Sequence, residues 1–146
     1  MVAGTYKYSL GEYMSAFKVD SSNSLVALML GLTFTHMACQ KFSAKKHSLV
    51  VQTCPFLSTY KSLRGDCQEV NYNLGRVMHQ LSLLPAALFD YKKGLNMEPS
   101  IKQEEGKEGH NKFNLSREMA FNKSLIYSSS GNMDLARMYT EKYITI

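Results

Sequence analysis

Residues 68–99 constrain the fold most strongly, because they contain two helical apolar stripes joined by a short turn. Apolar and aromatic side chains recur three and four residues apart, which places them along one face of each of two helices. The stripes are Val70, Leu74, Val77, Met78 and Leu81, followed by Ala87, Leu88, Tyr91 and Leu95. Pro85 suits the first turn of the second helix, where its missing N–H costs no hydrogen bond. The segment therefore predicts a pair of antiparallel helices.

Small residues stand where these two helices would approach each other. Gly75 lies on the first helix and Ala87 on the second, a spacing that resembles the tetratricopeptide repeat (TPR). With Gln68 as the first position, the Leu, Gly, Ala, aromatic and closing Pro positions are Leu74, Gly75, Ala87, Tyr91 and Pro99. The chain departs from the pattern at Asn71, Met78 and Gly94, which stand at the usual Trp, Tyr and Ala positions.

Related helical patterns cover the rest of the chain, which is predicted to be one all-α domain. The expected parts are a half repeat at 4–18, a repeat at 23–64, the central repeat at 67–99, a flexible linker at 100–113 and a terminal repeat at 114–146. About seven helices would form TPR-like antiparallel hairpins, stacked as a short right-handed solenoid. The half repeat would leave part of its apolar stripe uncovered, so Leu10 and Tyr13 are candidate contacts for a partner.

Three local features give further expectations. Pro55 lies inside the second helix of the 23–64 repeat, where it removes a hydrogen bond and should kink or end the helix. Asp66 to Glu69 resembles a capping box and should fix the start of the central repeat. Lys123 stands at an expected Leu position, so the terminal repeat should pack loosely. Pro55, Lys123, Gly94 and the charged segment 100–110 are departures that suggest relaxed constraint.

Charge, cysteines and hydropathy narrow the class of protein. The net charge of +5 is spread along the chain without a run of Lys and Arg longer than two, so it does not indicate a nucleic-acid surface. Three cysteines without a Cys-x-x-Cys pair are expected to be buried thiols in a reducing compartment. The apolar run from Leu25 to Phe34 is too short to cross a bilayer and should form a core helix.

Longer strings carry a more specific resemblance. They are Tyr-Lys-Tyr-Ser-Leu-Gly-Glu-Tyr-Met (6–14), Gly-Leu-Thr-Phe-Thr-His-Met-Ala (31–38), Tyr-Asn-Leu-Gly-Arg (72–76), His-Gln-Leu (79–81) and Ser-Leu-Ile-Tyr-Ser-Ser-Ser-Gly-Asn (124–132). These strings are spread over nearly the whole chain. They resemble the C-terminal portion of the TPR-bearing subunit 3 family of general transcription factor IIIC (TFIIIC). The resemblance implies a nuclear, non-enzymatic scaffold in RNA polymerase III transcription, with other TFIIIC subunits and TFIIIB as partners. It also implies that DNA is bound through the complex and at most indirectly by this chain.

The first helices of a TPR array line a groove, and five positions of each face the partner. On the central repeat these positions are Glu69, Tyr72, Arg76, His79 and Gln80, a polar and aromatic set suited to a peptide or helix. The preceding first helix offers Leu25, Leu28, Leu32, Thr35 and His36, which are too apolar for bare solvent. Neighbouring helices or the chain's own terminus should fill that section of the groove.

No motif predicts an enzyme, a metal site, a cofactor site or a small-molecule substrate. His79 and Asp90 have no Ser or Cys at nucleophile spacing, and Glu104-Glu105 has no His partner. Two other classes stay open. A free-standing TPR adaptor for a peptide or helix of an unrelated partner would be favoured by a clamp of Lys and Arg, of which only Arg76 is available. A basic nucleic-acid module would bind in a steeply salt-dependent way.

Overall fold

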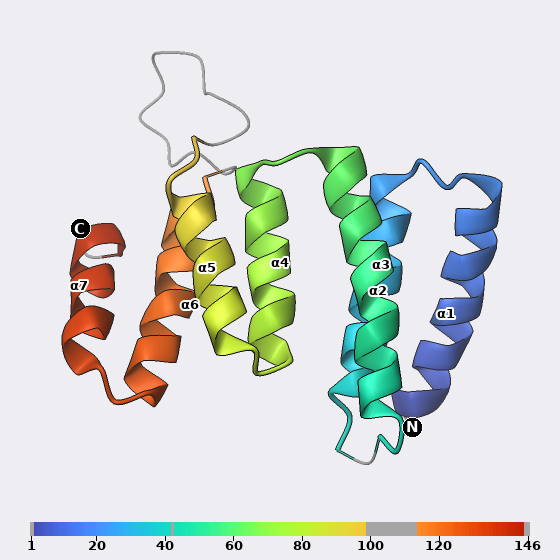
Figure 1. Cartoon of the computed structure of the whole chain (residues 1–146), viewed down its shortest axis with the longest axis horizontal. Helices are drawn as coiled ribbons and strands as arrows, with labels where there is room; N and C mark the ends of the chain where they lie inside the picture. Colours follow the sequence, from blue (N-terminus) through green and yellow to red (C-terminus); the bar gives the residue numbers. More distant parts are fainter. Residues whose placement is uncertain (1, 42, 99–113, 145–146) are drawn as a thin grey trace. The chain divides into compact units, whose positions relative to one another are not determined.

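The computed structural model describes residues 2–41, 43–98 and 114–144, and within these ranges the chain forms seven α-helices and no strand (Figure 1). The helices are α1 (Val2–Val19), α2 (Ser24–Ala38), α3 (Lys46–Arg64), α4 (Gln68–Gln80), α5 (Leu84–Leu95), α6 (Ser116–Ser129) and α7 (Met133–Tyr143). The prediction of an all-α chain with about seven helices is confirmed. The predicted linker at 100–113 lies outside the described residues.

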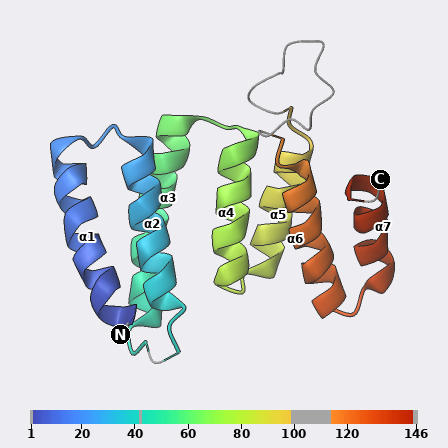
Figure 2. The same cartoon turned by 180° about the vertical axis from the view of Figure 1, so that it is seen from behind.

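The helices group into two compact units, residues 1–66 and residues 67–146. In the first unit α1 packs on α2 and α2 on α3, and in the second α4, α5, α6 and α7 each pack on the next (Figures 1 and 2). Successive helices in each unit are therefore antiparallel neighbours, as TPR-like hairpins require. The single domain and the right-handed stacking of the repeats stay predictions.

Helix α2 supplies most of the core of the first unit, as predicted for the run from Leu25 to Phe34. The side chain of Asn23 caps its first turn by accepting hydrogen bonds from the backbone N–H groups of Leu25 and Val26. Gly31 faces α3 so closely that a Cβ placed on it would lie 2.7 Å from Leu57 Cδ2. Without a side chain at Gly31, α2 and α3 can therefore approach each other closely at Leu57.

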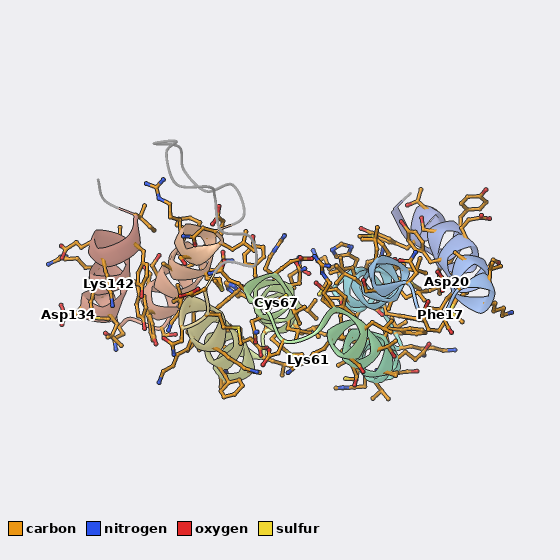
Figure 3. All side chains as sticks on the ribbon, turned by 90° about the horizontal axis from the view of Figure 1, so that it is seen from above. Phe17, Asp20, Lys61, Cys67, Asp134 and Lys142 are labelled. Atoms are coloured by element: carbon orange, nitrogen blue, oxygen red, sulfur yellow. The ribbon has the colours of Figure 1, made fainter. Side chains whose placement is uncertain are left out.

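Helix α1 covers part of α2 and α3 through a stripe of half-buried side chains. The ring of Tyr6 lies 5.8 Å from the imidazole of His36, and the ring of Phe17 lies edge-on to Phe56 of α3 at 5.7 Å. Figure 3 labels Phe17 on α1. Helix α1 therefore fills part of the apolar groove section that the sequence predicts on α2. Leu28 and Thr35 are buried, whereas Leu25 stays 59% exposed.

Pro55 does not end α3, which continues without interruption from Lys46 to Arg64. Pro55 and Val51 are both exposed. Proline removes the hydrogen bond to the carbonyl four residues earlier, and on this side of the helix water can reach the carbonyl of Val51. The helix therefore tolerates the proline on its outer face.

Two further expectations are wrong. Cys39 and Cys54 are exposed and Cys67 is half-buried, so the cysteines are not buried thiols. Cys39 follows the last turn of α2, and Cys54 lies on the outer face of α3, where its thiol donates to the carbonyl of Val50. The capping box was predicted with Asp66 at the N-cap, but Cys67 occupies the N-cap of α4 and its side chain makes no capping hydrogen bond.

The departures from the repeat pattern in the second unit are tightly packed, not relaxed. A Cβ on Gly94 would lie 2.5 Å from the sulfur of Met119, so a larger residue there would force the Met119 side chain to move. Lys123 is 2% exposed, and its Nζ donates a hydrogen bond of 2.7 Å to the hydroxyl of Tyr139. The expected loose packing at Lys123 is therefore wrong, because α7 supplies an acceptor for the buried ammonium.

Candidate partner-binding site

The candidate site lies where α4, α5 and α6 meet in the second unit. Tyr91 of α5 is fully buried, with its ring against Gly75 of α4. A Cβ on Gly75 would lie 2.5 Å from a ring carbon of Tyr91, so the small residue predicted from the sequence is required for this contact. The contact fixes the tyrosine ring and points its hydroxyl end toward the residues that line the site.

Gln68 fastens α4 to the beginning of α6. Its side chain is 1% exposed; the amide nitrogen donates to the hydroxyl of Ser116 at 3.2 Å, and the amide oxygen accepts from the backbone N–H of Leu115 at 2.8 Å. The same amide nitrogen reaches the carbonyl of Gly94 at 3.5 Å. These bonds hold the first helices of two successive hairpins in a fixed relation, which is what a groove across them needs.

A cleft of about 190 Å³ opens between the three helices. It is lined by Arg76, His79 and Gln80 of α4, Tyr91 of α5 and Asn122 of α6. Three of the predicted groove residues thus share one cleft.

The remaining predicted contacts lie elsewhere. Tyr72 supports the cleft, because the guanidinium of Arg76 lies over its ring at 5.7 Å from the centroid. Glu69 is half-buried near the start of α4 and does not line the cleft. Leu10 and Tyr13 are half-buried on α1, in the first unit.

Burial sets the charge of the cleft. His79 lies edge-on to the ring of Tyr91, with centroids 6.4 Å apart, and burial lowers the pKa of His79 below its ordinary 6.5. Burial, followed by the nearby Tyr72, raises the pKa of Tyr91, so its hydroxyl keeps its proton. At neutral pH Arg76 is therefore the charged group that lines the cleft.

Tyr91 and Asn122 are the lining residues that sequence reasoning missed. Tyr91 was predicted as a core aromatic, which is correct for its ring, and nothing in the pattern indicated that its hydroxyl would reach a cleft. Asn122 carried no signal, because its neighbour across the cleft is determined by how α6 packs on α5. Both omissions concern contacts between successive hairpins, which a pattern within one repeat does not describe.

The described residues offer no place for a metal ion, since no three His, Cys, Asp or Glu side chains gather among them. Nor does any helix in the described ranges combine the length and apolar character needed to cross a membrane. The site is thus a small polar cleft on a helical scaffold.

No protein family profile matches the chain. The chain is 44% identical over 145 residues to the human protein named General transcription factor 3C polypeptide 3, a match that covers 99% of this chain. It is homologous to a portion of TFIIIC subunit 3. Transcription factor tau 131 kDa subunit of Saccharomyces cerevisiae is 31% identical over 142 residues and covers 92% of the chain.

A third relative matches the same large share of this chain. Transcription factor tau subunit sfc4 of Schizosaccharomyces pombe is 30% identical over 145 residues and covers 93% of the chain. The chain spans only 13–16% of the length of these three relatives. The homology therefore concerns one segment of a much longer TFIIIC subunit.

Proposed function

We propose that this TFIIIC relative is a non-enzymatic scaffold for protein–protein interaction in RNA polymerase III transcription initiation. The match to a human general transcription factor at 44% identity over 99% of the chain is the observation that carries the proposal. The helical hairpins support it, because stacked hairpins present groove surfaces to partner proteins. The work of the scaffold is to assemble TFIIIC and to recruit TFIIIB in the nucleus.

The proposed partners are other TFIIIC subunits and TFIIIB, with DNA contacted through the complex. Neither a membrane nor a small-molecule substrate is part of the proposal. The groove side of α4 would contact a partner through Tyr72, Arg76, His79, Gln80 and Glu69. Leu10 and Tyr13 of α1 would form a second contact, because their half-buried side chains offer apolar surface to a neighbouring chain.

Co-purification from nuclear extract tests the proposal. A tagged chain is compared with a variant carrying Leu10→Asp and Tyr13→Asp, and with the control Tyr8→Asp, which places a single carboxylate of the same kind at a residue that is 73% exposed. We expect the intact chain and the control to recover TFIIIC subunits and TFIIIB, and the double variant to lose them. Circular dichroism checks that the helix content of all three chains is equal.

Two outcomes would contradict the proposal. If the intact chain recovers no TFIIIC subunit and no TFIIIB, a free-standing adaptor for an unrelated peptide or helix becomes the better explanation. Direct binding of the chain to DNA that weakens steeply between low and moderate salt would favour a basic nucleic-acid module. A contact made by aromatic and half-buried side chains should change little over the same range of salt.

A further inference from the structure

The cleft between α4, α5 and α6 contains hydrogen-bond donors that the described residues leave unused. The hydroxyl of Tyr91 is buried and makes no hydrogen bond of good geometry in the described part of the chain, although the Asn122 side chain approaches it as a hydrogen-bond partner and partly offsets the rise in its pKa. The guanidinium of Arg76 rests on the ring of Tyr72 and forms no ion pair with a described carboxylate. A buried polar group without a partner is costly, so it marks a position that a ligand atom can complete.

The chemistry of the lining favours a negatively charged acceptor. Arg76 presents a planar fork of N–H donors that matches the two oxygens of a carboxylate. Asn122 and Tyr91 each add a donor, and the lowered pKa of His79 leaves its ring uncharged at neutral pH. No Asp or Glu lines the cleft, although the carboxylate of Asp90 on α5 lies close enough to contribute to the raised pKa of Tyr91.

The size of the cleft restricts the ligand to a single side chain. The volume of the cleft is about 190 Å³. Pockets for cofactors and drug-sized ligands are usually larger, about 300–1,000 Å³. The cleft is therefore suited to the end of an amino-acid side chain that enters from a partner protein.

We propose that this cleft binds the side-chain carboxylate of an Asp or Glu residue of a partner protein, with Arg76 as the ion-pair partner and Tyr91 and Asn122 as hydrogen-bond donors. The inference rests on the proposed function, because it assigns one contact within the groove of the scaffold. The partner surface that docks here carries an acidic residue at its centre.

The first test uses N-acetyl-glutamate N-methylamide as the probe and follows the side-chain N–H signals of Arg76 and Asn122 by NMR. We expect saturable shifts of both signals at millimolar probe. The neutral probe N-acetyl-glutamine N-methylamide should give none. Equal shifts with the neutral probe would overturn the proposal, and so would shifts that do not saturate. Equal or larger saturable shifts with inorganic phosphate would also overturn it, because they would indicate a nucleic-acid backbone as the ligand.

Two variants separate binding from folding. Arg76→Gln changes an exposed side chain, and Tyr91→Phe removes only a hydroxyl that makes no hydrogen bond of good geometry in the described residues, so both should fold. Each should weaken binding of the glutamate probe at least about tenfold, whereas the matched controls Lys46→Gln and Tyr8→Phe should not change it. Tyr91→Phe should also unfold no earlier than the parent chain, a combination that a purely structural role would not produce. Unchanged binding by both variants would overturn the proposal.

Co-purification then distinguishes this inference from the proposed function. If Arg76→Gln recovers TFIIIC subunits as well as the intact chain does, the carboxylate contact is wrong while the scaffold function stands. If the intact chain recovers no TFIIIC subunit but the glutamate probe still binds, the scaffold function fails while the carboxylate site stands. Loss of TFIIIC recovery by Arg76→Gln, with retention by Lys46→Gln, supports both.

Discussion

The two hairpins of the second unit, α4/α5 and α6/α7, bury a side chain at the same position in opposite ways. Ala87 of α5 and Ala136 of α7 stand 49 residues apart, and both are buried. At the same offset, α4 places Leu74 and α6 places Lys123, and these two side chains are also buried. One hairpin therefore holds an alkyl group where the other holds an ammonium group.

The second helix of each hairpin explains the difference. Helix α5 presents the ring of Tyr91 to Gly75, a contact that depends on shape. Helix α7 presents the hydroxyl and the ring of Tyr139, and Lys123 Nζ lies 2.7 Å from that hydroxyl and 4.2 Å from the ring centroid. The ring of Tyr127 on α6 stacks on the ring of Tyr139, with centroids 5.7 Å apart. A buried position of the repeat thus accepts lysine when the facing helix supplies an acceptor and a π face.

Placing the lysine in the wrong hairpin should have the largest effect. Leu74→Lys would put an ammonium group where a buried alkyl group now packs, and a buried charge that stays uncompensated costs about 3–5 kcal/mol. We expect a loss of that size in the free energy of unfolding, measured by urea denaturation with far-UV circular dichroism. A loss below about 1 kcal/mol would mean that Leu74 is not held as tightly as its burial indicates.

The shape-dependent contact should respond to a single added methyl group. Gly75→Ala would bring a Cβ to 2.5 Å from the ring of Tyr91, so the ring or the helix must move. Overpacking of this kind costs about 1–3 kcal/mol, and we expect the upper part of that range. The matched control is Gly11→Ala on α1, where a Cβ meets open space and should not destabilise the chain. Equal stability of the two variants would contradict this account of the α4/α5 contact.

The bonds of Gln68 decide whether the two hairpins unfold as one structure. Gln68→Leu would leave the part-buried N–H of Leu115 without its acceptor, at a cost of about 1–2 kcal/mol. We expect faster amide hydrogen exchange throughout α6, not only in α4. The control Gln52→Leu on α3 removes an exposed bond to Ser48 and should change stability by less than about 0.5 kcal/mol. Exchange that rises in α4 alone would show that the hairpins open independently.

Much of the fold could be predicted from residue spacing. The apolar stripes of α4 and α5 and the need for glycine at Gly75 follow from contacts within one hairpin, which recur at fixed spacing. The predicted capping box at 66–69 would start this helix at Cys67, whereas α4 starts one residue later, at Gln68, with Cys67 as its N-cap.

The departures could not be interpreted one position at a time. The three residues Gly94, Asn71 and Met119 are packed together. Because Gly94 has no side chain, the sulfur of Met119 has room beside it, and a Cβ placed on Gly94 would also lie 3.3 Å from the Cβ of Asn71. Met119 follows 25 positions after Gly94, on the next hairpin, so no pattern within one repeat relates them. The candidate cleft is of the same kind, because Asn122 and the Tyr91 hydroxyl meet only when α6 packs on α5.

The pH dependence of stability should distinguish the two hairpins by the smallest but most specific effect. Burial lowers the pKa of Lys123 below its ordinary 10.5, so just below pH 10.5 the unfolded chain binds more protons at this residue than the folded chain. Its contribution to stability should therefore rise as pH increases through that window. Lys123→Met should remove this rise and, at neutral pH, change stability by no more than about 1 kcal/mol, because a matched apolar side chain replaces a buried charge.

Tyr91 acts in the opposite direction, because its raised pKa makes its contribution to stability fall as pH increases above its ordinary value of 10.0. The parent chain and the Lys123→Met variant both carry Tyr91. Subtracting the free energy of unfolding of the variant from that of the parent therefore cancels the effect of Tyr91 and leaves the pH dependence due to Lys123. Urea denaturation of the two chains at several alkaline pH values measures that difference. Parallel pH profiles would mean that Tyr139 and the aromatic rings keep Lys123 as easily protonated in the folded chain as in water, and the contrast between the hairpins would then be one of shape alone.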